Sequence, residues 1–238
     1  MQIKEIKNKL RKKAVVFQTG GARPENSFKQ SWIGKVKLGY KEEVCPVDIN
    51  LQPMFPLVQL CLADLPFIPQ ALQNTKVLTI FISSDFLDDS EGNFCIREYP
   101  TLENLVEKDF GGSIEGLKPF PLFPQLMEND FPAWCSDDSD DIYSNYIPSD
   151  LVDIILRMEK DEGIKYSEDI YEKNEAMHKI GGYPNYCRGD ALEFEAGYEF
   201  VFQVASDYKA ALEIGAGGNI YFAKNPTTNK WQANWDDY

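Results

Sequence analysis

Two stretches decide the fold, PLVQLCLADL at residues 56–65 and EFVFQVASDY at residues 199–208. Both are rich in β-branched, aromatic and other apolar residues, which is typical of buried strands. Each carries one glutamine among its apolar residues, Gln59 in the first and Gln203 in the second. A polar side chain in the middle of a buried strand must find hydrogen-bond partners, so we expect both glutamines to have a defined role.

The surroundings of the two stretches are also alike. A second apolar strand pattern follows each one, VLTIFIS at 77–83 and NIYFA at 219–223, and an isoleucine-glycine pair precedes each one, Ile33-Gly34 and Ile180-Gly181. The glycines are 147 residues apart and the glutamines 144, so the spacing is nearly constant. A repeat this long indicates duplication of a supersecondary unit rather than a solenoid, whose period is roughly 20 to 50 residues.

These patterns predict an α+β fold, mainly antiparallel β with peripheral helices, in one domain spanning residues 1–238. Two β-rich halves, about 14–100 and 165–238, are expected to be related by a pseudo-twofold. A proline-rich acidic segment and a helix, together 101–164, would join them. Further strands are predicted at 14–18, 94–99 and 231–235, and helices at 2–13 and from Ser149, as a capping residue, to Gly163.

The segment 119–148 differs in composition from both halves. It contains five prolines, and no lysine or arginine occurs from residue 119 to residue 156. Because proline cannot donate to a backbone ladder, we expect this segment to form neither a long helix nor a central strand.

Charge and hydropathy exclude several classes of protein. The formal net charge is −14, which disfavours binding to nucleic acid or to anionic membrane surfaces. The sequence has no run of the ~20 apolar residues that a membrane-spanning helix needs, and the basic N-terminus has no apolar run behind it. A soluble protein in the cytoplasm is therefore expected.

Metal and cofactor sites are not predicted. The five cysteines are widely spaced without a CxxC pair, and His178 is the only histidine, which disfavours structural zinc and a disulfide framework. The glycines of 181–182 and 215–218 lack the Lys-Ser/Thr ending of a phosphate loop and are interpreted as turns. The acidic run SDDSDD at 136–141 lacks the glycine and glutamate of a calcium loop. No catalytic residue and no cofactor are predicted.

Taken together, these motifs resemble the YwqG-like family, whose domains have no assigned function. The resemblance rests on PLVQLCLADLP, VLTIFIS, HKIGGYP at 178–184, and FVFQVASD followed by a glycine turn and NIYF, and it covers about Ser31 to Ala223. It implies a mostly antiparallel β fold with peripheral helices and an internal pseudo-twofold. The chain departs from the family pattern at 34–37, where a Gly-Gly-x-Pro turn is expected, and at Ala216, where an acid is expected.

The segment 119–148 is the first candidate for a functional surface. Its aromatic and acidic side chains suit docking to a basic protein, because the rings supply apolar area and the acids steer the encounter. Such a domain would be non-catalytic and could neutralise its partner, as an immunity protein does with a basic toxin. The alternative is that the aromatic residues only anchor a long loop. The predicted partner-binding residues are Phe123, Phe131, Trp134, Asp137, Asp138, Asp140 and Asp141.

A cleft between the two halves is the second candidate. Gln59, Gln203 and His178 would be its polar contacts, in a small-molecule-binding protein or an enzyme. The alternative for all three is a structural role, in which they satisfy hydrogen bonds within the protein.

Overall fold

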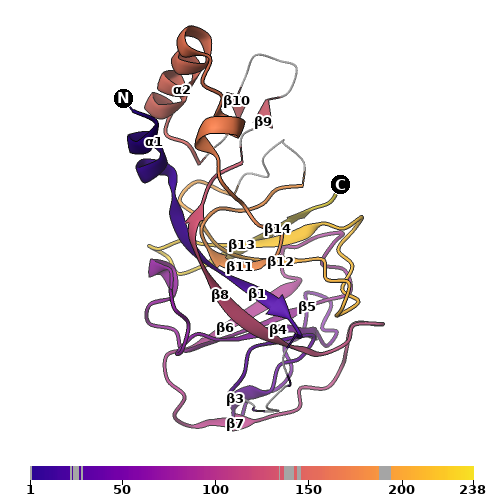
Figure 1. The fold of residues 1–238 in the computed structure, drawn as a ribbon. Coiled ribbons are helices and arrows are strands. Elements are labelled where there is room, and N and C mark those ends of the chain that lie inside the picture. The colour runs from indigo at the N-terminus through magenta and orange to yellow at the C-terminus, as the bar shows by residue number, and fades with distance from the viewer. Residues whose placement is uncertain are drawn as a thin grey trace.

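A computed structural model describes residues 2–21, 23, 27, 29–133, 135–136, 142–143, 146–187 and 194–238. Its main feature is one ten-stranded antiparallel sheet that curls into a nearly closed, barrel-like shape (Figure 1). In sheet order the strands are β14 (Trp231–Asp236), β13 (Asn219–Lys224), β12 (Glu199–Ala205), β11 (His178–Gly181), β1 (Lys12–Thr19), β8 (Phe120–Asp130), β2 (Trp32–Ile33), β4 (Phe55–Cys61), β5 (Val77–Ile82) and β6 (Phe94–Tyr99).

Two short ladders lie outside this sheet. One pairs β3 (Leu38–Tyr40) with β7 (Leu105–Glu107), and the other pairs β9 (Cys135–Ser136) with β10 (Ile142–Tyr143). The β3 and β7 strands lie at the opposite end of the molecule from the helices (Figure 1). The prediction of a mainly antiparallel β fold is confirmed.

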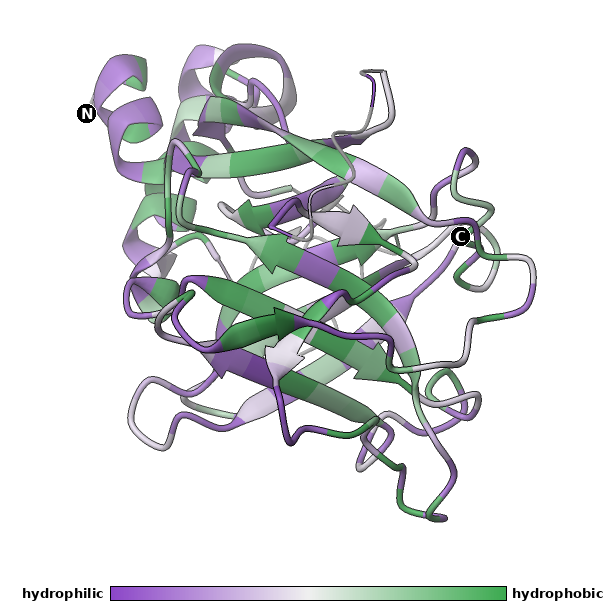
Figure 2. Cartoon of the chain, turned by 90° about the horizontal axis from the view of Figure 1, so that it is seen from below, coloured by the Kyte–Doolittle hydropathy of each residue, from purple (hydrophilic) through white to green (hydrophobic). Residues whose placement is uncertain are grey.

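The curled sheet encloses one apolar core to which both ends of the sequence contribute. Apolar residues are concentrated on the strands, whereas the connecting loops are mostly hydrophilic (Figure 2). Burial of this apolar area is the main stabilising contribution to such a fold. Core residues come from nearly every strand and include Phe17, Ile33, Leu57, Ile80, Ile180, Val204 and Phe222.

The expectation that segment 119–148 contains no central strand is wrong. Its first part forms β8, which lies between β1 and β2 in the middle of the sheet. Leu122 donates its N–H to Ser31 O at 2.9 Å, on the β2 side. The backbone groups of successive residues point alternately to the two neighbouring strands, so the backbone nitrogen of Pro124, two residues on, also faces β2. Since β2 pairs only with Phe120 and Pro121, it ends before Pro124, and the ladder needs no donor there.

The two α-helices of the described residues lie at one end of the sheet (Figure 1). The α-helices are α1 (Ile3–Leu10) and α2 (Ser149–Glu162), and shorter turns form η1 (Gln70–Leu72) and η2 (Tyr166–Ile170). The predicted stop of α2 at Gly163 is confirmed, with a φ of 70°, but Ser149 is the first helical residue rather than its cap. In the described part of the chain, neither helix has the length and apolar character that crossing a membrane requires.

A second apolar cluster holds the helices together, and a polar network joins them to the sheet. Asp130 at the end of β8 and Lys179 on β11 form a fully buried ion pair of 3.1 Å. Asp130 also accepts the Tyr183 N–H at 2.7 Å, and Tyr183 Oη donates to Leu10 O at 2.5 Å. Burial raises the pKa of Asp130 and lowers that of Lys179, while their mutual attraction opposes both shifts. The second cluster comprises Ile6, Leu10, Phe131, Ile147, Leu151, Ile155, Met158, Tyr166 and Ile170.

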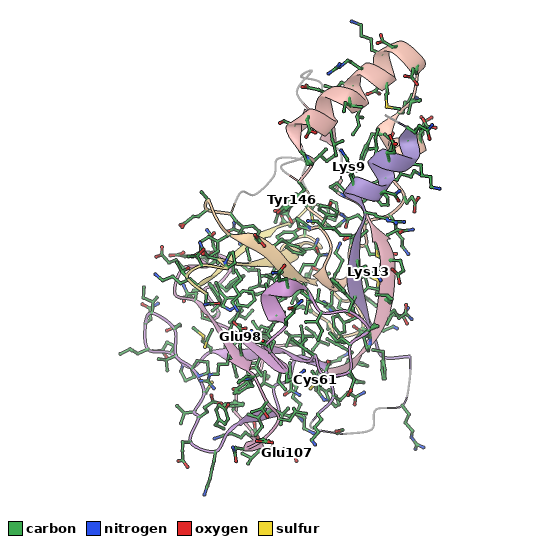
Figure 3. All side chains as sticks on the ribbon, turned by 90° about the vertical axis from the view of Figure 1, so that its left-hand side faces the viewer. Lys9, Lys13, Cys61, Glu98, Glu107 and Tyr146 are labelled. Carbon is green, nitrogen blue, oxygen red and sulfur yellow. The ribbon has the colours of Figure 1, made fainter. Side chains whose placement is uncertain are left out.

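Side chains bridge the two edge strands, β6 and β14, along what we call the seam. The side chain of Glu98 on β6 is labelled in Figure 3. It forms an ion pair of 2.7 Å with Lys224 and accepts a hydrogen bond from Trp231 Nε1 at 3.0 Å. Trp235 Nε1 donates to Leu87 O at 2.9 Å. The seam therefore joins residues 87 and 98, in the first half of the sequence, to residues near its end.

Candidate functional site

Gln59 is fully buried on β4, and its side chain holds the chain on both sides of β2. Its Oε1 accepts the N–H groups of Lys37 at 2.8 Å and Leu38 at 3.0 Å, and its Nε2 donates to Gln30 O at 2.9 Å. The chain reverses at Gly34, whose φ of 71° favours glycine. The side chain of Gln59 therefore supplies the partners that the backbone beside β2 needs.

Gln203 does the same for β11. Its Oε1 accepts the N–H of Asn185 at 2.9 Å, and its Nε2 donates to Met177 O at 3.0 Å. The turn here is at Gly181, with a φ of 72°, where a Cβ would lie 2.8 Å from Phe67. In both halves the carbonyl acceptor lies four residues before the glycine, and an N–H donor lies four residues after it. We call this arrangement the glutamine bracket.

His178, the third predicted contact, belongs to a buried network with Asp207. Its Nδ1 accepts the N–H of Ala205 at 3.1 Å, which places the proton on Nε2, and Nε2 lies 3.3 Å from Asp207 Oδ2. Thr19 Oγ1 also donates to this carboxylate. His178 and Gln203 border a common void of about 10 Å³, which has room for one water molecule at most, and Gln59 is not among the residues that line it. A ligand role for the three residues stays a prediction.

The predicted partner-binding residues are only partly within the described structure. Phe131 is fully buried in the helix cluster, and Phe123 on β8 is partly buried. Phe131 packs within the helix cluster, and its role in partner binding stays a prediction. Trp134, Asp137, Asp138, Asp140 and Asp141 lie outside the described residues.

The structure instead exposes apolar side chains on residues 44–53, which we call the apolar hairpin. The exposed fractions are 74% for Val44, 49% for Val47, 68% for Ile49 and 77% for Leu51. Single exposed apolar residues are ordinary, but several on one short segment are typical of an interaction surface. In the sequence the hairpin lies between β3 and β4.

Hydrogen bonds make the apolar hairpin rigid. The buried side chain of Asp48 accepts the N–H groups of Asn50 and Gln52, both at 2.8 Å. Asp48 N also donates to Gln52 O at 2.9 Å, and Val47 and Pro53 form an antiparallel bridge. An ordered loop loses little conformational entropy on binding, which favours affinity.

Leu51 occupies a backbone conformation that favours glycine. Its φ is 62°, in the left-handed region, which costs an L-residue with a Cβ roughly 1 kcal/mol. The side chain is also largely exposed, so it recovers little of this cost by packing. A strained residue that presents an apolar side chain to solvent is a candidate for function.

An acidic turn lies beside the hairpin. Gly92 is close to Ile49, since a Cβ at this glycine would lie 3.4 Å from the Ile49 Cβ. The residues before it include four exposed acids and no base, namely Asp85, Asp88, Asp89 and Glu91. The apolar surface is therefore bordered by negative charge on this side.

Sequence reasoning missed the hairpin, although the pattern was visible. Val47, Ile49 and Leu51 alternate with Asp48 and Asn50, which is typical of a strand with one buried face. Alternation does not say which face is buried, and here the apolar face is exposed.

A polar cleft of about 580 Å³ lies at one end of the seam. Its charged floor is the Glu98–Lys224 pair, and Thr75 Oγ1 donates to Glu98 at 2.7 Å, so these groups already bind one another. In the described ranges no group of three or more His, Cys, Asp or Glu side chains could hold a metal ion. The exposed polar side chains around the cleft are Gln70, Asn74, Glu199 and Asn229.

Comparison with known families decides what this arrangement belongs to. The family model described as a domain of unknown function, DUF1963, matches residues 37–228. The chain belongs to the DUF1963 family. The match includes the apolar hairpin, the whole bracket of Gln203 and, in the first bracket, Gln59 with its partners Lys37 and Leu38. Of the seam it includes Leu87, Glu98 and Lys224. No curated protein matches the chain.

The Asp207 network predicts a specific dependence on pH. Burial alone would raise the pKa of Asp207, but hydrogen bonds from His178 and Thr19 outweigh it and hold this pKa below its ordinary value. A lowered folded-state pKa adds stability above the unfolded-state value of about 4, and this stability is lost as the pH falls below it. Between pH 6 and pH 3 the free energy of unfolding should therefore fall by about 1 kcal/mol less for Asp207→Asn than for the unmodified domain. Chemical denaturation at each pH measures this free energy.

Asp64→Asn is the matched control, because Asp64 is the next-to-last residue of the stretch 56–65 as Asp207 is of 199–208, but Asp64 is exposed. The free energy of unfolding of this variant should change with pH as that of the unmodified domain does. If the free energy of unfolding falls equally with pH for Asp207→Asn and for the unmodified domain, the role given to the network is contradicted.

Leu51→Gly should leave the free energy of unfolding within about 1 kcal/mol of the original value or raise it. Relief of the left-handed strain offsets the larger backbone entropy of glycine. Leu51→Ala, which keeps the strain, is the control and should give no gain. Denaturant unfolding measures both, and a loss above about 2 kcal/mol for Leu51→Gly would show that this leucine is needed for packing.

Proposed function

We propose that the domain is a non-catalytic protein-interaction module that docks through the apolar hairpin. The observation that carries this proposal is the exposure of Leu51 and Ile49 on a loop that Asp48 holds rigid. Rigid apolar side chains that enter a partner's pocket are typical anchors of protein interfaces. The strain at Leu51 supports the same conclusion, since glycine would fit the backbone better at that position.

The partner is proposed to be a basic protein. The acidic turn beside Ile49 and the formal net charge of −14 would attract lysine and arginine side chains around an apolar pocket. The acidic segment with Asp137, Asp138, Asp140 and Asp141 remains a second proposed contact with the same partner. An immunity-like neutralisation of a basic toxin is one form that this interaction would take.

The proposal is tested by comparing two variants of the full chain as baits in extract from the native host. The hairpin variant is Ile49→Ser with Leu51→Ser, and the segment variant replaces the four aspartates at 137, 138, 140 and 141 with asparagine. We expect a basic protein to bind the unmodified domain, and titration with this purified partner to show an affinity at least tenfold weaker for the hairpin variant. The reason is that one buried anchor contributes more than about 1.4 kcal/mol.

The segment variant separates the two surfaces. It should retain the partner with an affinity reduced mainly at low salt, because exposed charges act over a distance that salt screens. A partner that is lost from the segment variant but binds the hairpin variant unchanged would overturn the proposal in favour of the acidic segment.

We further infer that the two halves arose by duplication. The pairing of β2 with β4 places Ile33 opposite Val58, and the pairing of β11 with β12 places Ile180 opposite Phe202. The β4–β5 ladder shifts register immediately before Val58, and the β12–β13 ladder shifts immediately before Phe202. Both β4 and β12 also carry the glutamine of a bracket. These parallels support the pseudo-twofold that the YwqG-like resemblance implies. The YwqG-like name and a cytoplasmic location stay predictions.

A further inference from the structure

We propose that a second cleft, at the opposite end of β5 and β13 from the polar cleft, binds a small molecule with an apolar body and one cationic group. We call it the apolar cleft. Its volume is about 410 Å³, which is in the range of small-molecule sites. The proposal goes beyond the protein-interaction function, because no residue of the apolar hairpin lines this cleft.

The walls of the apolar cleft come from both halves of the sequence. The first half contributes the end of β5 and the following loop, and the second half contributes residues 212–214 and the start of β13. Contact of a ligand with these side chains would remove apolar surface from water on both sides, which is the main source of affinity in such sites. The apolar lining residues that form its floor are Phe55, Ile82, Phe86, Leu212, Ile214 and Ile220.

Hydrogen bonds between the halves form this cleft in advance of any ligand. Lys118 N donates to Ala210 O at 2.7 Å, which ties the loop carrying Glu115 to the loop carrying Leu212. On the other wall, Trp235 on β14 donates to the carbonyl of Leu87 at 2.9 Å. The walls therefore do not have to be assembled when a ligand binds, and less of the binding free energy is spent on ordering them.

Two carboxylates at the cleft decide the charge of the ligand. Glu115 comes from the loop before β8 and Glu213 from the loop before β13, and both are exposed residues that line the cleft. Among the residues that the structure describes, neither side chain has a hydrogen-bond or ion-pair partner. The described residues that line the cleft include no lysine, arginine or histidine. A cationic head group would meet two free acceptors there, whereas an anionic one would be repelled.

The probes for the test are n-octylammonium, n-octanol and n-octanoate, which share one apolar chain and differ in charge. Titration calorimetry of the full chain should show one saturable site per chain for n-octylammonium, weaker binding of n-octanol, and the weakest binding of n-octanoate. All three are used below the concentrations at which they self-associate. Equal affinity for the cation and the anion, or no saturable binding of n-octylammonium, would overturn the proposal.

A matched pair of variants distinguishes the cleft carboxylates from the overall negative charge. Glu115→Gln with Glu213→Gln should weaken n-octylammonium binding by about five- to tenfold and leave n-octanol unchanged. Glu103→Gln with Glu162→Gln removes the same charge at exposed positions elsewhere and should leave both affinities unchanged. Equal losses in the two double variants would show that binding follows net charge only and would contradict the site.

Ser113→Trp keeps the test independent of charge. Ser113 is exposed and lines the cleft, so a large ring there should obstruct it without disturbing the core, and should reduce the binding of all three probes. Unchanged binding to this variant would place the probes elsewhere and overturn the proposal. The protein-interaction proposal is unaffected by either result, because its readout is the partner's affinity for the Ile49 and Leu51 variants.

Discussion

The rest of the structure depends on the way a buried glutamine satisfies the backbone of its neighbouring strand. β2 and β11 are short, and the chain on either side of each leaves the sheet with peptide groups that the ladder does not pair. Gln59 and Gln203 supply these partners from the adjacent strand. A buried peptide group without a partner costs about 1 to 3 kcal/mol, so an apolar residue at either position would leave several such groups unpaired. The brackets thereby fix the register of the strands on both sides of the central β1–β8 pair.

The same brackets determine where function can lie. The side chains of both glutamines and of His178 bond to other protein groups, and the described residues leave His178 and Gln203 a common void of only about 10 Å³. The binding sites proposed above therefore lie at the surface. The seam brings distant parts of the sequence together and leaves a polar cleft at one end and an apolar cleft at the other. The apolar hairpin lies in the connection between β3 and β4, which begins just after Leu38, a backbone partner of Gln59, and leads into the strand that carries Gln59.

Sequence reasoning found the strands that are mostly apolar on both faces, such as 77–83, because runs of β-branched and aromatic residues predict a buried strand. It failed for β8, where Pro121 and Pro124 argue against a central strand. Whether the missing N–H of a proline matters depends on how far the neighbouring strand extends, and no local sequence pattern reveals that length. It also identified Gln59 and Gln203 as residues that must find partners, but placed them in a cleft as one alternative. The atoms that complete these buried amides come from chain segments 18 to 29 residues away, and composition does not specify them.

Amide hydrogen exchange on bracket variants tests the central role of the glutamines most directly. In Gln59→Met, the account predicts that the amide of Lys37 exchanges about 10- to 100-fold faster while that of Asn185 is unchanged, and in Gln203→Met the reverse. Unchanged exchange at the bracketed amide in both variants would contradict the account, because it would show that these side chains are not what holds the chain beside β2 and β11.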